Sequence, residues 1–442
     1  MIPSEFLRRM ERLLGPEEYS RFLSSYDRPL QKGLRLGHKA RGAALPFALT
    51  PLPWAPGGYA YDPGQRPGKH PYHEAGLYYL QEPSAMAPAA LLHPQPGERV
   101  LDLCAAPGGK STQLAEFLGG TGLLVSNEIH PKRARILSRN IERMGIPNAL
   151  VLNMHPRDLE SRFPGFFDRV MVDAPCSGEG MFRKEEAAVT DWSPETVAMC
   201  ADRQKEILRS AAAMLRPGGF LCYSTCTFAP EEDEGVMAWF LKEYPDFAPV
   251  AVEAPWFAPA RPEWADSPDR RIARGFRLWP HLLGGEGHFV MLLQRAGDAS
   301  APPSPPPSSI SMPKELTDFL QALDITLPAG ELLSFGPSLY LAPMGTPKLE
   351  GLKVLRPGLE LGTLKKGRFE PAHALALWLD TCRSTADFPA DSQEVLDYLH
   401  GQVLPGAQVG WTLITVDGHS LGWAKGSGGQ LKNHFPKGLR WV

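Results

Sequence analysis

Two cysteines lie where apolar, strand-like runs of the sequence end. Cys176 follows the run FDRVMVDA (167–174), and Cys226 ends the run FLCYSTC (220–226). A proline and two glycines around the first cysteine prevent regular structure from continuing. The carboxyl ends of strands in open parallel sheets are the usual place for ligand chemistry, and a thiol can act there as a nucleophile. Both cysteines are therefore candidate nucleophiles, and their spacing does not decide which one attacks.

The other four cysteines lack this context. Cys104 lies in a loop of small residues, and Cys200, Cys222 and Cys382 are interpreted as small buried side chains, the usual role of a lone cysteine. The six cysteines form no CxxC pair, so neither a zinc site nor a secreted disulfide framework is predicted. We expect no bound metal, and free thiols in a reducing compartment.

A glycine-rich loop forms the candidate ligand site. The stretch RVLDLCAAPGGKSTQLAEFL (99–118) predicts a strand, a loop and a helix. Small loop residues let the backbone approach a ligand closely, and the first amides of the helix can bind a polar or charged group. The candidate cofactor-binding residues of this loop are Cys104, Ala105, Ala106, Pro107, Gly108, Gly109 and Lys110.

Two classes of ligand compete for this loop. GGKST resembles the end of a triphosphate-binding loop, with VMVDA in the place of its magnesium-binding acid, but that motif requires glycine at position 104. A nucleoside fits better, because Glu128 ends the next strand-like run about 20 residues after Gly108, where an acid accepts both ribose hydroxyls. A nucleoside-binding sheet without a pyrophosphate fingerprint predicts S-adenosylmethionine as the cofactor. A nucleotide triphosphatase is the alternative.

Alternating strand-like and helix-like patterns from Glu74 to Arg295 predict the sheet that positions these residues. The expected strands are RVLDLC (99–104), GLLVSNE (122–128), NALVLNM (148–154), DRVMVDA (168–174), FLCYSTC (220–226) and HFVMLLQ (288–294), and the expected helices are 111–118, 131–144, 193–215 and 231–244. This order predicts an α/β fold with a Rossmann-like parallel sheet.

Composition limits the class of protein. Hydrophobic residues make up 43% of the chain, which is ordinary for a globular protein, and no apolar run approaches the ~18 residues of a membrane span. MIPSEFLRRMERLLG imitates a transit peptide, but Glu5 and Glu11 interrupt it and no cleavage region follows, which predicts a folded cytoplasmic start. The net charge of −3 offers no global attraction to a polyanion, so any nucleic-acid face must be local.

Three motifs identify a resemblance to a known family. DLCAAPGGK (102–110), DAPCSGEG (173–180) and STCT (224–227) resemble the Nop/Nol/Sun (Fmu) family of RNA cytosine-5 methyltransferases. Residues 1–295 follow the family pattern, including LYYLQEPSAMAPA (77–89). VLRPGLELGTLKKGRFEPAHALAL (354–377) resembles a bacterial branch that acts on small-subunit (16S) ribosomal RNA and ends in a PUA-like barrel. The resemblance covers nearly the whole chain and implies an S-adenosylmethionine-dependent RNA (cytosine-5-)methyltransferase.

The chemistry of this family explains why a thiol is needed. Carbon 5 of cytosine is a poor nucleophile, and thiolate addition to carbon 6 turns it into an enamine carbon that can be methylated. The resemblance implies that Cys226 adds to the base and that Cys176 assists release of the product. DNA cytosine methyltransferases place the attacking thiol in the proline-cysteine motif, so the reverse assignment stays open. The resemblance also implies that Asp173 contacts the cytosine and the cofactor, that Lys110 orients Asp173, and that Glu128 binds the ribose.

The resemblance and the composition divide the chain. We expect an N-terminal RNA-binding module (1–73), a methyltransferase domain (74–298), a Pro/Ser-rich linker (299–312) and a C-terminal α+β region with an RNA-binding PUA-like barrel (313–442). A monomer is expected. One position departs from the family pattern: members often carry an adenine-binding acid after the third strand, whereas this chain has His155 and only later Asp158.

Local basic runs are the expected contacts to ribosomal RNA, free or in the assembled small subunit. They are Lys132, Arg133, Arg135, Arg139 and Arg143; Lys425, Lys432, Lys437 and Arg440; and, within the first 41 residues, Arg8, Arg9, Arg12, Arg21, Arg28, Lys32, Arg35, Lys39 and Arg41. Basic runs of this kind usually form solvent-exposed surfaces, but around a methyltransferase core we expect them to bind RNA phosphates. A catalytically silent RNA-binding assembly factor is a third interpretation, against which the two retained motif cysteines argue.

Overall fold

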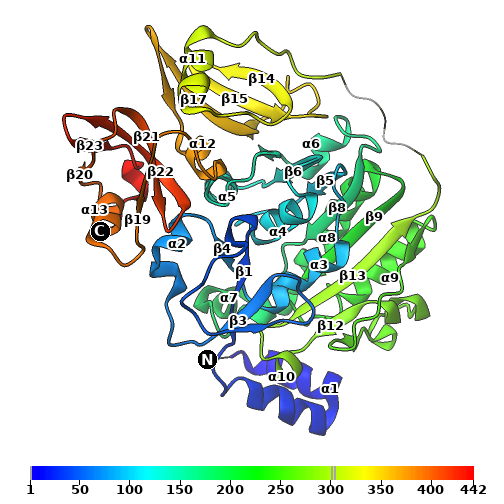
Figure 1. Cartoon of the computed structure of the whole chain (residues 1–442). Coiled ribbons are helices and arrows are strands. Elements are labelled where there is room, and N and C mark those ends of the chain that lie inside the picture. Colours follow the sequence, from blue (N-terminus) through cyan, green and yellow to red (C-terminus); the bar gives the residue numbers. More distant parts are fainter. Residues whose placement is uncertain (1, 300–301, 303–304) are drawn as a thin grey trace.

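The computed structural model describes residues 2–299, 302 and 305–442. Figure 1 shows a large central sheet with helices packed against it, the N-terminal helix at one end and the C-terminal region along one side. This architecture confirms the α/β fold class and the separate α+β region that the sequence predicts.

Five parallel strands form the centre of the main sheet in the order β9-β8-β5-β6-β7. Their bounds are Arg99–Asp102 (β5), Leu123–Asn127 (β6), Ala149–Leu152 (β7), Phe167–Asp173 (β8) and Leu215–Thr225 (β9). The sixth predicted strand, β13 (His288–Arg295), pairs antiparallel with β9. Short strands extend this edge: Phe247–Pro249 (β10), Ala258–Pro259 (β11) and Phe276–Leu278 (β12).

Two apolar layers hold helices against this sheet. On one face α4 (Gly109–Leu118) and α5 (Pro131–Arg143) share a buried cluster with the strands, and on the other α8 (Pro194–Met214) and α9 (Glu234–Glu243) share a second cluster. The four helices lie where the sequence predicts them, except that α9 begins at Glu234 rather than at residue 231. Shorter helices are Ala87–Leu92 (α3), Pro156–Glu160 (α6), Glu186–Asp191 (α7) and Pro280–Leu283 (α10).

The N-terminal helix α1 (Ser4–Ser25) packs on segments that lead away from the two motif cysteines. Its Phe6 ring meets Trp192 edge-on at 5.9 Å between centroids, and Phe22 meets Trp279 at 6.1 Å. Both phenylalanines are fully buried, so the amphipathic start of the chain belongs to the folded molecule.

A small antiparallel sheet follows α1 in the order β2-β3-β1-β4. Its strands are Lys32–Leu36 (β1), Leu49–Pro51 (β2), Gly58–Tyr61 (β3) and Tyr78–Leu80 (β4), and the short helix α2 (Pro71–Glu74) precedes β4. The sheet therefore continues beyond residue 73, where composition placed a boundary. Two basic residues expected to face RNA are buried instead: Arg35 is 1% and Lys39 6% exposed. Arg35 donates a hydrogen bond of 2.6 Å to Thr112 of α4, so it joins the small sheet to the core.

The C-terminal region forms two further sheets, ordered β14-β15-β17-β18 and β19-β21-β22-β23-β20. The strands are Gly330–Phe335 (β14), Ser338–Pro343 (β15), Leu359–Lys365 (β17), Arg368–Pro371 (β18), Thr385–Phe388 (β19), Leu404–Pro405 (β20), Gly410–Val416 (β21), His419–Ser427 (β22) and Gln430–Asn433 (β23), with helices Lys314–Leu323 (α11), His373–Trp378 (α12) and Gln393–His400 (α13).

Strand pairing and buried hydrogen bonds join the C-terminal region to the rest of the molecule. Strand β16 (Val354–Pro357) pairs antiparallel with β7 and adds an edge strand to the main sheet. The buried Lys39 ammonium donates hydrogen bonds to the carbonyl oxygens of Ala75 and Leu377 and to the hydroxyl of Ser420. Figure 1 shows the last sheet lying beside the small N-terminal sheet, and the two share a buried apolar cluster.

The proline- and serine-rich linker lies partly outside the described residues, which omit 300, 301, 303 and 304. Pro302 and residues 305–312 contain no helix or strand. Within the described ranges 2–299, 302 and 305–442, none of the helices combines the length and the apolar character needed to span a membrane.

Candidate active site

The predicted site residues converge at the carboxyl ends of the parallel strands. Loop 104–110 follows β5, Glu128 follows β6, Asp173 ends β8, and Cys226 follows β9. The order of strands reverses at β5, whose neighbours are β6 and β8, and such switch points hold ligands in doubly wound sheets. Pairing of β8 with β9 then brings Cys176 beside Cys226, although many residues separate them in the sequence.

Cys176 and Cys226 form a pair of thiols. Their Sγ atoms lie 3.3 Å apart, within hydrogen-bonding range for sulfur, and both residues are partly exposed. The hydrogen bond to Cys226, together with burial, raises the pKa of the Cys176 thiol well above its ordinary value. Cys176 therefore keeps its proton at neutral pH and can donate it toward the sulfur of Cys226.

Lys110 and Asp173 form an ion pair at the same edge of the sheet. Lys110 Nζ lies 2.8 Å from Asp173 Oδ2, and Ser224 Oγ donates a 2.8 Å hydrogen bond to Asp173 Oδ1. Burial acts to raise the pKa of Asp173, but the charge of Lys110 and the hydrogen bonds from Lys110 and Ser224 outweigh it and lower this pKa. Burial acts to lower the pKa of Lys110, but Asp173 outweighs it and raises this pKa. Both groups stay charged, and the Asp173 side chain, 32% exposed, can still meet a ligand.

The segment after Cys226 supports the segment after Cys176 through a buried acid. Glu232 is 0% exposed, and its Oε2 accepts hydrogen bonds from Ser177 N at 3.0 Å and Gln204 Nε2 at 2.7 Å. Burial raises the pKa of Glu232 to about 7. Because Ser177 directly follows Cys176, this acid fixes the backbone that carries the thiol.

The next two acids are buried as well. Asp233 and Glu234 are 0% exposed and both pair with Arg277 of β12, whose Nη1 lies 3.2 Å from Asp233 Oδ2 and whose Nε donates a 2.8 Å hydrogen bond to Glu234 Oε1. Sequence reasoning missed all three acids, because a run such as PEEDEG usually marks a solvated face. Their position directly after STCTF is the only signal that could have found them.

Two buried carboxylates, Glu128 and Asp102, lie at the strand ends next to the glycine-rich loop. Glu128 is 3% exposed, and its Oε1 accepts a 2.9 Å hydrogen bond from His130 N. Asp102 is 0% exposed; Ser111 Oγ donates to its Oδ2 at 2.6 Å, while its Oδ1 has no hydrogen-bond partner among the described residues. Burial raises the pKa of Asp102 to about 7. Glu128, at the end of the second strand, fits the ribose of a nucleoside cofactor. The unpartnered Asp102 Oδ1, next to the loop, fits the cationic amino-acid part of such a cofactor.

The segment after β7 bears on adenine recognition. His155 is exposed and accepts a 3.2 Å hydrogen bond from Arg157 N at the start of α6, and Asp158 is also exposed. Asn153, which sequence reasoning missed, is 5% exposed and donates a 2.7 Å hydrogen bond to Glu128 O. The end of β7 therefore holds Glu128 in place through a neutral amide.

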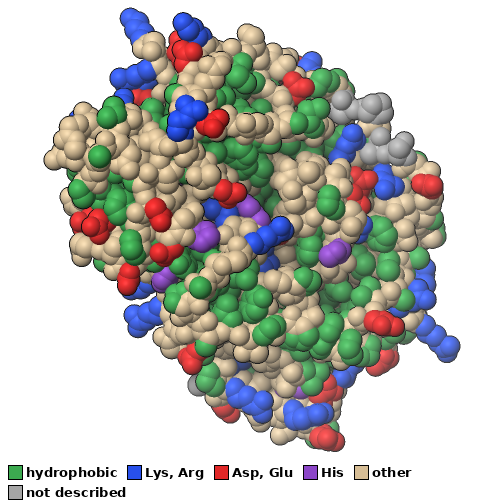
Figure 2. All heavy atoms as spheres, in the orientation of Figure 1, with side chains coloured by type: hydrophobic (Ala, Val, Ile, Leu, Met, Phe, Trp, Pro, Cys, Tyr) green, Lys and Arg blue, Asp and Glu red, His purple; other side chains and the backbone are tan. Residues whose placement is uncertain are grey.

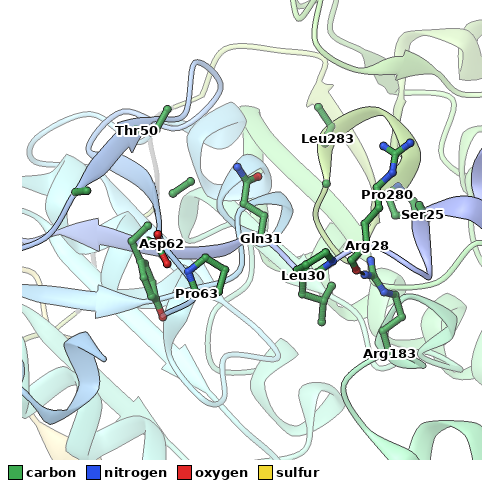
Figure 3. A pocket seen from close by; sticks show the side chains of 15 residues that line it. Ser25, Arg28, Leu30, Gln31, Thr50, Asp62, Pro63, Arg183, Pro280 and Leu283 are labelled. Atoms are coloured by element: carbon green, nitrogen blue, oxygen red, sulfur yellow. Dashed lines mark hydrogen bonds between the residues drawn. The ribbon is translucent and has the colours of Figure 1, made fainter. Parts of the chain in front are cut away.

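A cavity of about 540 Å³ opens between α10, the N-terminal sheet and the segment that follows the DAPCSGEG motif. Figure 3 shows Arg28 and Arg183 next to each other at one end, with Asp62 and Thr50 at the other. The Arg183 guanidinium lies 5.6 Å from the centre of the Tyr26 ring and donates a hydrogen bond to Arg28 O. Sequence reasoning selected Arg28 but missed Arg183.

The predicted basic contacts separate into buried and exposed groups. Arg143 is not part of an RNA surface, because its Nη1 donates to the carbonyl oxygens of His73 and Tyr78. Lys132, Arg133, Arg135 and Arg139 are exposed on α5, as are Lys425, Lys432 and Lys437 near the C-terminus. On the face drawn in Figure 2, basic and acidic side chains are interspersed over the part of the chain that the structure describes.

Comparison with family models covers most of the chain. Residues 89–294 match the 16S rRNA methyltransferase RsmB/F model, and residues 2–83 match the N-terminal domain of 16S rRNA methyltransferase RsmF. Residues 318–379 match the RsmF rRNA methyltransferase first C-terminal domain, and residues 385–441 match the methyltransferase RsmF PUA domain. The expected PUA-like region is thereby confirmed.

Individual relatives extend over the same length. Ribosomal RNA small subunit methyltransferase F of Salmonella schwarzengrund is 32% identical over 99% of this chain and 96% of the relative, and the Shigella boydii protein of that name gives the same values. A methyltransferase homolog protein from Pyrococcus horikoshii has a TM-score of 0.57 and 26% identity, covering 66% of this chain and 100% of that one. NSun6 from Pyrococcus horikoshii with SFG, at 19% identity and TM-score 0.57, covers 67% and 99% and shares the fold.

Proposed function

Because this chain belongs to the RsmB/F family of 16S rRNA methyltransferases, which depend on S-adenosylmethionine, we propose that it methylates carbon 5 of cytosine in small-subunit ribosomal RNA through a covalent cysteine adduct. The contact between Cys176 Sγ and Cys226 Sγ, at 3.3 Å, is the observation that carries the proposal. Addition to carbon 6 and later elimination require a nucleophile and a second proton-transfer group near the same two carbons, and two adjoining thiols supply both.

In this proposal Cys226 is the nucleophile and Cys176 the group that assists release. The raised pKa of Cys176 supports this assignment, because a thiol that keeps its proton can stabilise a neighbouring thiolate by a hydrogen bond. The buried Glu232 holds the backbone at Ser177, so the thiol of Cys176 stays directed toward its partner. The reverse assignment would require Cys176 to ionise first, against both burial and the hydrogen bond that its thiol donates to Cys226 Sγ.

Asp173 and Lys110 hold the target base in this proposal. The lowered pKa of Asp173 keeps a carboxylate at the end of β8, where it can accept a hydrogen bond from the exocyclic amine of cytosine. Lys110 and Ser224 fix the two oxygens of this carboxylate.

The cofactor site combines Glu128 with the loop 104–110. Glu128 binds the ribose hydroxyls, and the loop backbone and Asp102 receive the amino-acid part, for which the unpartnered Asp102 Oδ1 is available. When bound, S-adenosylmethionine supplies an electrophilic methyl group. Asn153 keeps the backbone of Glu128 in place.

Methyl transfer to ribosomal RNA tests the proposed function directly. We expect the protein to bind S-adenosylmethionine in calorimetry and to methylate a cytosine of small-subunit RNA from a strain that lacks the gene, as read by bisulfite sequencing. Naked RNA and isolated small subunits, assayed in parallel, identify the substrate form. Binding of ATP without binding of the methyl donor would instead support a nucleotide triphosphatase. Cofactor binding without methylation of either substrate would support a silent assembly factor.

Exposed lysines on the C-terminal sheet are the best candidates for phosphate contacts. Lys425 and Lys432 lie directly opposite each other on β22 and β23, and the Lys425 ammonium lies 5.6 Å from the centre of the Trp411 ring. Like charges directly opposite in a sheet are destabilising, so the pair fits a surface that binds an anion. The aromatic neighbour fits nucleic acid.

Replacing Lys425 and Lys432 by glutamine is therefore expected to weaken RNA binding and to lower the slope of log affinity against log salt by about two. S-adenosylmethionine affinity should not change, and the thermal midpoint should stay level or rise because a repulsion is removed. Fluorescence anisotropy with labelled RNA at several salt concentrations measures the slope. Lys242→Gln, on α9, is the matched control. An unchanged slope in the double variant would assign this surface to another role.

A further inference from the structure

The strand register places a histidine next to the proposed nucleophile. In the ladder between β13 and β9, Val290 pairs with Ser224 and Phe289 pairs with Thr225. The ladder ends at the second of these pairs, and continuing its register by one step brings His288 opposite Cys226. Directly opposite residues of an antiparallel pair have Cβ atoms about 4.5–5.5 Å apart. His288 therefore lies within side-chain reach of the Cys226 thiol.

The alternation of side chains puts His288 on the catalytic face of the sheet. Met171, Cys222 and Val290 belong to the buried cluster shared with α4 and α5. Two residues further toward the site along each strand are Asp173, Ser224 and His288, which face the same side because side chains alternate with a period of two. Asp173 and Ser224 already contact each other on this face.

A chain of hydrogen bonds fixes the orientation of the imidazole. Ser84 Oγ donates a 2.6 Å hydrogen bond to Glu82 Oε2, and it lies 3.0 Å from His288 Nδ1. Since the Ser84 proton is directed to Glu82, His288 Nδ1 must donate to Ser84 Oγ. The other ring nitrogen, Nε2, is then left without a proton.

Burial keeps the His288 imidazole neutral in the free protein. Burial is the largest cause of a lowered pKa of about 4, to which the positive charge of Lys110 adds, while Glu82 and Asp173 oppose them. His288 is 5% exposed. Its Nε2 is therefore able to accept a proton, and the negative charge of bound RNA would raise its proton affinity.

We propose that His288 is the general base that takes the proton of the Cys226 thiol when this thiol adds to cytosine, with Ser84 and Glu82 as positioning residues. This inference rests on the proposed function. Glu82 and Ser84 belong to the stretch LYYLQEPSAMAPA (77–89), which lies far from His288 in the chain, so the sequence alone did not indicate this contact.

The two cysteines, His288 and solvent account for every proton that moves in this reaction. The Sγ–H bond of Cys226 breaks and its proton passes to His288 Nε2, while a new bond forms between Sγ and carbon 6 and the double-bond electrons move toward carbon 5. After methylation the proton on carbon 5 passes to Cys176 Sγ while the thiol proton of Cys176 leaves to solvent. The bond between Cys226 Sγ and carbon 6 breaks, and its electron pair returns to Cys226 Sγ. The His288 proton then restores the Cys226 thiol.

The rate of adduct formation as a function of pH tests this role. In a Cys176→Ala background, where the adduct is expected to accumulate, His288→Gln should slow adduct formation at pH 7 by about 10²-fold, the typical contribution of a general base. The slowed rate should rise about tenfold per pH unit, because it follows the thiolate concentration, whereas the rate with His288 present should change less. Quenching into denaturant at timed intervals measures both.

Controls separate this role from a structural one. Binding of S-adenosylmethionine and RNA by the His288→Gln variant should match that of its parent. Ser84→Ala keeps the imidazole but no longer fixes which ring nitrogen carries the proton. Adduct formation by this variant should therefore be slower than in its parent, with the same change in pH profile as in His288→Gln and a smaller loss of rate. Equal rates and pH profiles with and without His288 would overturn the inference. Absence of any adduct in the parent with His288 would instead overturn the proposed function.

Discussion

Replacement of Cys226 by alanine is expected to abolish methyl transfer and the covalent protein–RNA adduct, while binding of RNA and of S-adenosylmethionine persists. The loss should be about 10⁴- to 10⁶-fold, the scale on which enzymes depend on their nucleophile. Cys176→Ala should behave differently, because Cys226 can still add to the base but the product leaves slowly. A denaturant-resistant complex should then accumulate when the methyl donor is present.

Denaturing gel electrophoresis with labelled RNA distinguishes the two variants. Cys382→Ala is the matched control, since this thiol lies in the C-terminal region and donates to the carbonyl oxygen of Ser384. Both motif cysteines are partly exposed, so their truncation leaves a small change in packing and the variants should fold. Adduct from Cys226→Ala and none from Cys176→Ala would make Cys176 the nucleophile.

Asp173→Asn should produce the second largest loss of activity, about 10²- to 10³-fold in the rate of a single turnover. The amide keeps the shape of the side chain but removes the charge that Lys110 and Ser224 hold in place. It also leaves the buried Lys110 ammonium without its counter-charge, so the thermal midpoint should fall. Rapid-quench methylation assays and thermal unfolding measure the two effects separately.

A double variant separates the chemical from the structural role of this pair. Lys110→Met combined with Asp173→Asn removes both charges, so the thermal midpoint should recover at least partly, since the two residues are in contact and their effects are not additive. Activity should remain low, because no carboxylate meets the base. Recovery of activity together with stability would show that the pair only supports the fold.

Local patterns in the sequence determined the main sheet and most of the candidate site. Six apolar runs between turn residues predicted β5, β6, β7, β8, β9 and β13, because strand length, β-branched content and bounding turns are properties of short segments. The positions of Glu128, Asp173 and Cys226 at strand ends followed from the same runs. Since parallel strands in a doubly wound sheet end at one edge, the sequence was sufficient to place these residues at a common edge.

The tertiary structure alone decided which polar residues are solvated and which are neighbours. Arg35, Lys39 and Arg143 were predicted to contact RNA, and the acids 232–234 were given no role. All six are partly or fully buried, because their partners come from distant segments. The edge strand β16 and the pairing of His288 with Ser84 depend in the same way on chain segments far apart in sequence. Pairing between such segments depends on the packing of the whole molecule, and the residue types within one window carry no record of it.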